Sequence, residues 1–194
     1  MRPAVHRGHT QVSDVAEVLI EGPWRHRFVE ANGARFHVAE ADPDDVPPST
    51  LPNSTPAAPP LVVLLHGFPQ FWWAWRHQLP ALAAAGYRAA AMDLRGYGGS
   101  DKPPRGYDTA TLAADVAGVV RALGASEAVI VGHDWGAWLA WAMPTLHPTV
   151  TTAIGVFSMG HPLTMRGLMA RGRQRTTLAR ALAYQTPFVP ERRL

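Results

Sequence analysis

Two segments of alternating hydrophobic and polar residues open the patterned part of the chain. They run from Trp24 to Glu30 and from Ala34 to Glu40, and Asn32-Gly33 lies between them. Alternation places every second side chain on one face of a strand, and Asn-Gly is a strong signal for a tight hairpin turn. The pattern predicts an antiparallel β-hairpin over residues 24–40.

Beyond residue 60 the pattern changes to short apolar runs that alternate with segments of helical spacing. The run 61–65 is continuously apolar, which is typical of a strand buried on both faces. We expect further strands at 88–94, 128–131 and 150–158, and helices at 72–85, 109–123 and 137–146. This order predicts βαβ units. The expected fold class is therefore α/β, with a mostly parallel sheet and an N-terminal antiparallel hairpin.

Local signals mark where the expected helices begin and end. Gly86 and Gly124 follow the first and second helices and are expected to end them, while Thr109 is a candidate N-cap of the second. A short helical turn is expected near residues 15–20. These signals set the boundaries that the structure can test.

Three segments lack the strand or helix pattern of the core. Residues 1–23 are expected to form an N-terminal arm, and residues 41–60, with seven prolines, an exposed irregular loop. Residues 163–184 have the pattern of a basic amphipathic helix or helix pair. The expected organisation is an arm at 1–23, a core at 24–162 that contains the loop 41–60, and a separate segment at 163–194.

Composition places the chain among soluble globular proteins. Its 194 residues are 47% hydrophobic and 17% charged, which suits one domain with a buried core. The sequence has no cysteine, so disulfides and thiolate metal sites are excluded, and we expect neither a metal nor a cofactor. No apolar run has transmembrane length, and the first residues lack the apolar stretch of a secretory signal. A cytoplasmic location without membrane contact is the expectation.

Positive charge gathers near the C-terminus. Residues 163–194 contain seven arginines and one glutamate, a net charge of +6, so the other 162 residues sum to −3 of the total of +3. A basic segment can bind nucleic acid. Arginines spaced along a helix more often form a solvated face, so we expect no nucleic-acid partner.

The candidate chemistry lies in Gly132-His133-Asp134-Trp135-Gly136, between an expected strand and an expected helix. Small residues on both sides of Asp134 allow a sharp turn that lifts one side chain above a sheet. A carboxylate with a pKa of about 3.9 is ionised at neutral pH without a base. Its attack on an acyl carbon gives a reactive anhydride, whereas attack on an sp3 carbon gives a stable ester. The turn therefore points to epoxides or alkyl halides, unless Asp134 is only an N-cap.

Together these residues resemble the epoxide hydrolase branch of the α/β-hydrolase superfamily. The resemblance is dense over residues 61–162, and residues 184–191 are similar to an early part of that family's helical cap. It is carried by His66-Gly67-Phe68-Pro69 with Trp72, Trp75 and Arg76, and by the runs 85–88, 93–100 and 132–136. Asp at the nucleophile position makes the last run the most specific.

The resemblance implies a set of site residues. Asp134 would be the nucleophile, and the backbone N–H groups of Phe68 and Trp135 would form an oxyanion hole. Pro69 would fix the loop through a cis peptide bond, and Pro69, Trp72 and Trp135 would line a substrate pocket. Trp72 has the alternative of packing in the core.

Other polar residues of these motifs have structural interpretations. His66 and His133 are expected to support the loops through hydrogen bonds. Asp93 and Arg95 are expected to form a structural turn, with Asp93 bonding loop backbone. None of these four residues is expected to perform chemistry.

The sequence also departs from the family pattern. In this fold an acid and then a histidine follow the nucleophile, but no histidine follows His161. A cap tyrosine that would protonate the epoxide oxygen corresponds to Arg180. We therefore expect a truncated chain that ends early in the helical cap and is inactive alone.

Two alternatives to an epoxide hydrolase with a small-molecule substrate stay open. A haloalkane dehalogenase is one, although that group typically has Asn where Phe68 stands, and Phe68 offers no side-chain donor to a halide. A non-catalytic remnant or interaction module is the other. The oligomeric state is not indicated.

Overall fold

The computed structural model describes residues 15–45 and 59–170 of the chain. They belong to two units, 1–157 and 158–194, and each is treated by itself. In the second unit the described helix is α4 (Pro162–Ala170). The basic helix expected over 163–184 therefore lies mostly outside the described residues, as does residue 180. Within the described residues, no helix is long and apolar enough to cross a membrane.

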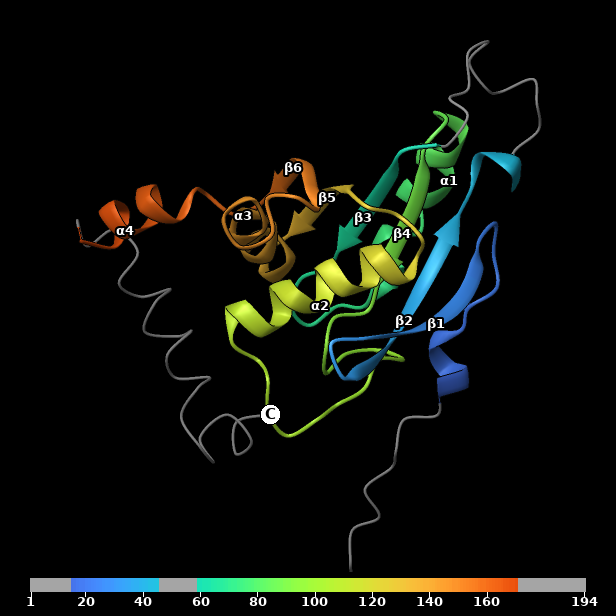
Figure 1. Cartoon of the computed structure of the whole chain (residues 1–194), viewed down its shortest axis with the longest axis horizontal. Coiled ribbons are helices and arrows are strands. Elements are labelled where there is room, and N and C mark those ends of the chain that lie inside the picture. The colour runs from blue at the N-terminus through green and yellow to red at the C-terminus, as the bar shows by residue number, and fades with distance from the viewer. Residues whose placement is uncertain (1–14, 46–58, 171–194) are drawn as a thin grey trace, which may run out of the picture. The chain divides into compact units, whose positions relative to one another are not determined.

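A mixed β-sheet forms the centre of the first unit (Figure 1). Its six described strands have the order β1-β2-β4-β3-β5-β6. β1 pairs antiparallel with β2, and β2 with β4, whereas the remaining pairs are parallel. The strands are β1 (Arg25–Ala31), β2 (Ala34–Ala41), β3 (Leu61–Leu65), β4 (Arg88–Met92), β5 (Ala128–His133) and β6 (Thr151–Phe157). The predicted fold class is confirmed.

The first hairpin forms at the predicted turn. Asn32 and Gly33 have φ values of 46° and 72°, the positive values that a two-residue hairpin turn requires. They bring Ala31 opposite Ala34 and set the register of β1 against β2.

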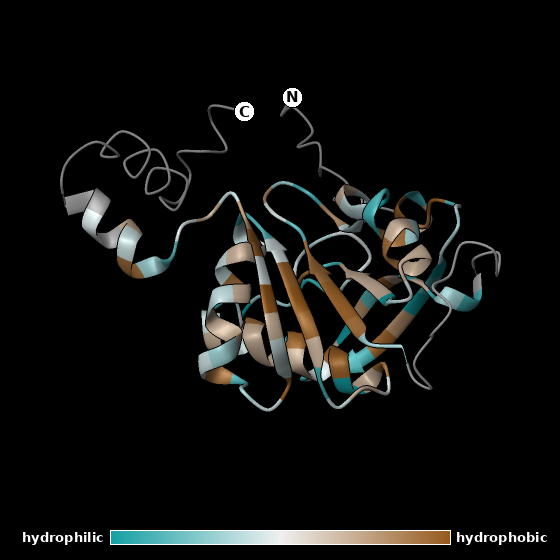
Figure 2. Ribbon diagram, turned by 90° about the horizontal axis from the view of Figure 1, so that it is seen from above, coloured by the Kyte–Doolittle hydropathy of each residue, from teal (hydrophilic) through white to brown (hydrophobic). Residues whose placement is uncertain are grey.

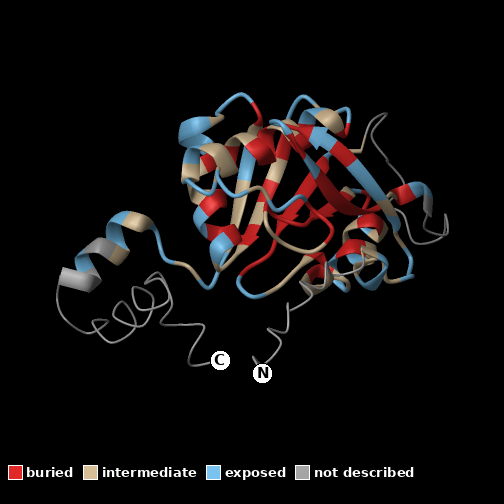
Figure 3. Cartoon of the chain, turned by 90° about the horizontal axis from the view of Figure 1, so that it is seen from below, coloured by how far each residue is buried: buried red, intermediate tan, exposed pale blue. Residues whose placement is uncertain are grey.

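Helices cover both faces of the sheet. α2 (Thr109–Ala122) and α3 (Trp135–Leu146) pack on one face, while η4 (Trp72–Trp75) and α1 (Gln78–Ala84) pack on the other. β3 shows why both layers are needed. Val63 packs into the core beneath α2 and α3, whereas Val62 packs into the core beneath η4 and α1. Figures 2 and 3 show that the central strands are the most hydrophobic and most buried.

Two helix boundaries differ from the predictions. The single helix expected over 72–85 is split into η4 and α1, because a continuous helix would place Pro80 in its interior, where proline has no N–H to donate. The N-cap of α2 is Asp108 and not Thr109. The Asp108 carboxylate accepts hydrogen bonds from the Thr111 N–H (3.0 Å) and hydroxyl (2.7 Å).

The proline-rich segment begins later than predicted. Ala41 is the last residue of β2 and is buried, and Pro43 is buried in η2 (Pro43–Asp45). The expectation of an exposed loop from residue 41 is therefore wrong for 41–43. Residues 46–58 lie outside the described residues. Near the N-terminus, η1 (Val15–Val18) confirms the expected helical turn.

Candidate active site

Asp134 is the one residue between β5 and α3. Its φ and ψ are 52° and −114°, a conformation that few residues other than glycine adopt. The flanking glycines are required by contact. A Cβ on Gly132 would lie 2.1 Å from the Gly136 oxygen, and a Cβ on Gly136 would lie 2.2 Å from the Leu65 oxygen. The chain thus makes the sharp strand-to-helix turn that its sequence predicts.

The Asp134 side chain does not cap the helix that follows it. Asp134 holds the N-cap position of α3, but its carboxylate makes no capping hydrogen bond. Instead, Oδ1 accepts a hydrogen bond of 3.0 Å from the Phe68 N–H. Among the described residues no other hydrogen bond reaches this carboxylate, so Oδ2 is left for a bound molecule. The geometry therefore does not support the alternative that the Asp134 side chain only caps α3.

The loop after β3 comes very close to Asp134. A Cβ on Gly67 would lie 2.6 Å from the Asp134 Cβ, so glycine is what lets the loop approach. The Phe68–Pro69 peptide bond is cis, as expected. The side chains of Phe68 and Pro69 are exposed, with 56% of Phe68 accessible.

The buried His66 side chain holds this loop through hydrogen bonds. Its Nε2 accepts a 3.0 Å hydrogen bond from the Leu94 N–H, so its Nδ1 carries the proton that is donated to the Gly67 oxygen over 2.9 Å. Burial lowers the pKa of His66, which favours the neutral ring that this pair of bonds requires. The scaffold interpretation of His66 is confirmed.

His133 and Gln70 form a second support. The Gln70 Oε1 accepts hydrogen bonds from the Gly67 N–H (3.1 Å) and the His133 ring (3.2 Å). His133 therefore has the expected supporting role. The sequence reasoning missed Gln70, because its partner stands 63 residues away and no local pattern joins them.

The turn after β4 is held by buried charge. Asp93 accepts hydrogen bonds from the N–H groups of Trp72 (2.7 Å) and Gly99 (2.9 Å), and its second oxygen lies 2.8 Å from His37 Nδ1. The Arg95 guanidinium donates to both oxygens of Asp115, at 2.6 and 2.7 Å. The structural role predicted for Asp93 and Arg95 is confirmed, whereas His37 and Asp115 were not foreseen as their partners.

Trp72 does not line a pocket. Its side chain is fully buried, and its indole N–H donates to the Val18 oxygen over 2.7 Å. It packs edge-on against Trp24 and Trp73. The predicted pocket role of Trp72 is therefore wrong, and the core alternative holds. Trp135 differs, because 51% of its side chain is exposed beside Asp134.

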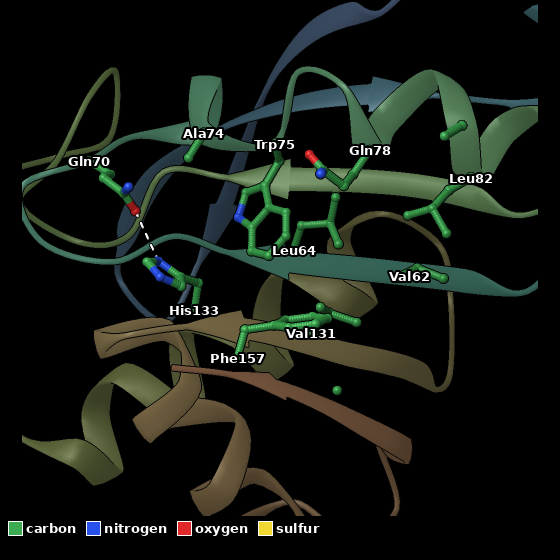
Figure 4. Close-up of a pocket in the computed structure, with 12 residues that line it drawn as sticks. Val62, Leu64, Gln70, Ala74, Trp75, Gln78, Leu82, Val131, His133 and Phe157 are labelled. Atoms are coloured by element: carbon green, nitrogen blue, oxygen red, sulfur yellow. Dashed lines mark hydrogen bonds between the residues drawn. The ribbon is translucent and has the colours of Figure 1, made fainter. Parts of the chain in front are cut away.

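The residues on either side of Asp134 line two different cavities. His133 borders a cavity of about 640 Å³, whose walls include Val62, Leu64 and Val131 on the face of the sheet. Figure 4 shows Trp75 over this apolar wall and the Gln70–His133 hydrogen bond at one end. The Trp75 indole N–H is buried there without a partner in the described structure. Trp135 borders a smaller cavity of about 210 Å³ between α2, α3 and the loop after β4.

Comparison with known proteins agrees with the α/β fold described above. The family described as "alpha/beta hydrolase fold" matches residues 60–166. Epoxide hydrolase B of Mycobacterium tuberculosis is 45% identical over 147 residues, which are 74% of this chain and 37% of that protein.

Solved structures give the same result. An epoxide hydrolase from an endophytic Streptomyces is 46% identical with a TM-score of 0.61, over 70% of this chain and 37% of that one. Epoxide hydrolase A from Mycobacterium thermoresistibile is 41% identical with a TM-score of 0.59, over 68% and 38%. The chain thus spans less than half the length of these three relatives.

Proposed function

Because the chain belongs to the α/β-hydrolase fold family and is similar to its epoxide hydrolases, we propose that Asp134 is the nucleophile of an epoxide-opening site. The observation that supports the proposal is the backbone conformation of Asp134 together with the hydrogen bonding of its carboxylate. Asp134 stands at a positive φ above the sheet, one oxygen is held by the Phe68 N–H, and the other accepts no hydrogen bond within the described structure. A buried structural aspartate such as Asp93 has both oxygens engaged.

The first step follows from this arrangement. Asp134 Oδ2 attacks one carbon of the epoxide, the C–O bond of that carbon breaks, and the freed oxygen takes a proton from water. The products are an alkyl ester on Asp134, a hydroxyl group on the neighbouring carbon, and a hydroxide ion released to the solvent. No base is needed, because a carboxylate nucleophile, unlike a hydroxyl, has no proton to lose before it attacks.

The Phe68 N–H has its role in the second step. Oδ1 becomes the carbonyl oxygen of the ester, and attack of water on the Asp134 Cγ places negative charge on that same oxygen. A donor already 3.0 Å from Oδ1 suits an oxyanion hole. We assign the Trp135 N–H as the second donor, since it opens α3 where helical N–H groups lack intrahelical partners.

The second step also needs a base to activate water. His66 and His133 are hydrogen-bonded to loop groups, and no hydrogen bond joins either ring to the Asp134 carboxylate in the described structure. We therefore propose that the 194-residue chain alone forms the ester once and releases it slowly. The alternatives of a haloalkane dehalogenase and an interaction module gain no support from the relatives, and a small-molecule epoxide is the proposed substrate class.

Mass spectrometry of the full chain after incubation with a terminal epoxide tests the proposal. We expect a single adduct on the peptide that contains Asp134, and its absence in Asp134→Asn. Circular dichroism of both proteins controls for folding. An unmodified Asp134 in a folded sample, or many turnovers that survive Asp134→Asn, would falsify the proposal.

A further inference from the structure

The two cavities beside Asp134 differ in their position on the sheet. The larger one lies against the sheet face, because its wall residues Val62, Leu64 and Val131 belong to strand interiors. The smaller one includes residues just past the ends of strands: Leu94 is the second residue after β4, and Trp135 is the second residue after β5. Ligands of open α/β sheets bind outside the carboxyl ends of the strands. By position, the smaller cavity is the one on the substrate side.

Aromatic rings dominate the walls of this smaller cavity, which we call the aromatic cavity. It is lined mainly by Tyr97, Tyr107, Trp135 and Trp138, together with Leu112 and Leu139. Its volume is about 210 Å³. An apolar cavity of about 150 Å³ is enough to hold benzene, so one aromatic ring fits here.

The charge distribution around the aromatic cavity favours an uncharged ligand. Arg95 also lines the aromatic cavity, but its guanidinium is bound by both oxygens of Asp115. A cation would therefore lie near a fixed positive charge, and an anion would find that charge already paired. The edges and faces of aromatic rings instead suit a second aromatic ring.

The walls are held in place before any ligand arrives. The Trp138 indole N–H donates to the Thr109 hydroxyl over 3.1 Å, which fixes the indole at the start of α2. Tyr107 packs over Gly96, where an added Cβ would lie 2.9 Å from the Tyr107 ring. A cavity with fixed walls loses little side-chain freedom when a ring enters it.

Two wall residues connect the aromatic cavity to the nucleophile. Trp135 is the neighbour of Asp134 in the chain. The Tyr97 ring packs edge-on against His66, 5.1 Å away between centroids, and His66 supports the loop that carries the Phe68 N–H. The pKa of Tyr97 is raised by burial and then by the charge of Asp134, which favours the protonated hydroxyl.

We infer that the aromatic cavity binds the aryl substituent of an aryl epoxide while the epoxide carbon faces Asp134, with Trp138 and Tyr107 setting this preference. The inference rests on the proposed function and narrows its substrate class. It assigns residues of α3 and of the loop before α2 that none of the sequence motifs singled out.

A matched pair of terminal epoxides tests the preference in the full chain. Styrene oxide carries an aromatic ring, whereas 1,2-epoxybutane carries an ethyl group, which is also uncharged and apolar. We expect faster alkylation of Asp134 by styrene oxide. Trp138→Ala should lower the ratio of the two rates by about tenfold, the value of one aromatic contact. Trp141→Ala, on the same helix but outside the cavity wall, is the matched control and should keep the wild-type ratio.

A binding measurement separates this inference from the chemistry. The unreactive 1-phenyl-1,2-ethanediol should shift the indole N–H signal of Trp138 in an NMR spectrum, and 1,2-butanediol should not. If neither epoxide labels Asp134 but the phenyl diol shifts Trp138, the proposed reaction fails and the cavity assignment stands. If both epoxides label Asp134 with a ratio that Trp138→Ala does not change, the cavity assignment is overturned and the reaction stands.

Discussion

Asp93 and Asp134 occupy equivalent places in the sheet and have opposite environments. Each directly follows a parallel strand, Asp93 after β4 and Asp134 after β5. Asp93 is fully buried, and three donors surround its two oxygens. Asp134 is half-buried on a positive-φ backbone, and its carboxylate receives one described hydrogen bond. The comparison shows how one side-chain type serves structure when its oxygens are saturated and can serve chemistry when one oxygen is left open.

The largest effect is expected from removing the saturated carboxylate. Asp93→Ala leaves the N–H groups of Trp72 and Gly99 buried without an acceptor, next to a ring nitrogen of His37. We expect the free energy of unfolding to fall by about 4 kcal/mol, measured by urea denaturation. Asp101→Ala is the control, because Asp101 is exposed and its carboxylate accepts one described hydrogen bond, from the Arg35 N–H. An equal loss in both variants would show that saturation is not what matters.

The next effect concerns the backbone that holds Asp134. In Gly136→Ala the new methyl group would lie 2.2 Å from the Leu65 oxygen, and neither backbone can move without displacing β3 or α3. We expect a loss of about 3 kcal/mol in the free energy of unfolding, together with loss of Asp134 alkylation. Gly124→Ala is the matched control. It has a positive φ of 82° but open space around the Cβ position, so it should cost only about 1 kcal/mol. Equal losses would show that the contact with the Leu65 oxygen is relieved at little cost in free energy.

The sequence predicts the Asp134 side of this comparison better than the Asp93 side. The glycines that permit the turn lie within two residues of Asp134, so a short motif contains the requirement. Gly99 is near Asp93 in the sequence, but the other two partners of Asp93 are distant: Trp72 stands 21 residues away and His37 stands 56 residues away. Local patterns cannot contain such contacts.

The remaining errors have the same physical origin. Trp72 was expected at the pocket because aromatic residues near a motif can have either role, and the core that buries it is assembled by Val18, Trp24 and Trp73. The break before α1 was visible in Pro80, and the cap of α2 in Asp108. In the predicted boundaries, the hydrophobic periodicity of the surrounding segment counted for more than Pro80 or Asp108, because one polar or cyclic residue does not change that periodicity.

A smaller effect on stability is expected from the protonation of buried histidines. Burial lowers the pKa of His66 below its ordinary value of 6.5, and burial likewise lowers that of His26. Above pH 6.5 both rings are neutral in the folded and unfolded chains, so stability is complete. As the pH falls below 6.5, the unfolded chain binds protons that the folded chain resists, and stability is lost. The fully buried His66 ring contributes a slope of up to about 1.4 kcal/mol per pH unit.

Urea denaturation at several pH values between 7.5 and 5 measures this slope. His66→Asn removes one titrating ring, and the slope should become shallower by the share of His66, whatever the variant costs at pH 7.5. A slope that is the same in wild type and variant would show that His66 takes up its proton as easily in the folded chain as in the unfolded one.

The smallest change in stability is expected at Asp134 itself. Asp134→Gly loses the hydrogen bond from the Phe68 N–H, worth about 1 kcal/mol, and the favourable charge at the start of α3, worth about 0.5 kcal/mol. It also relieves a positive-φ backbone that costs a non-glycine residue about 1–3 kcal/mol, although glycine adds about 1 kcal/mol of unfolded-state entropy. These contributions nearly cancel, so the free energy of unfolding should stay within about 1 kcal/mol of wild type. Alkylation by a terminal epoxide should be lost completely. If Asp134→Gly destabilised the chain as strongly as Asp93→Ala, the Asp134 carboxylate would be a structural group, and the contrast between the two aspartates would collapse.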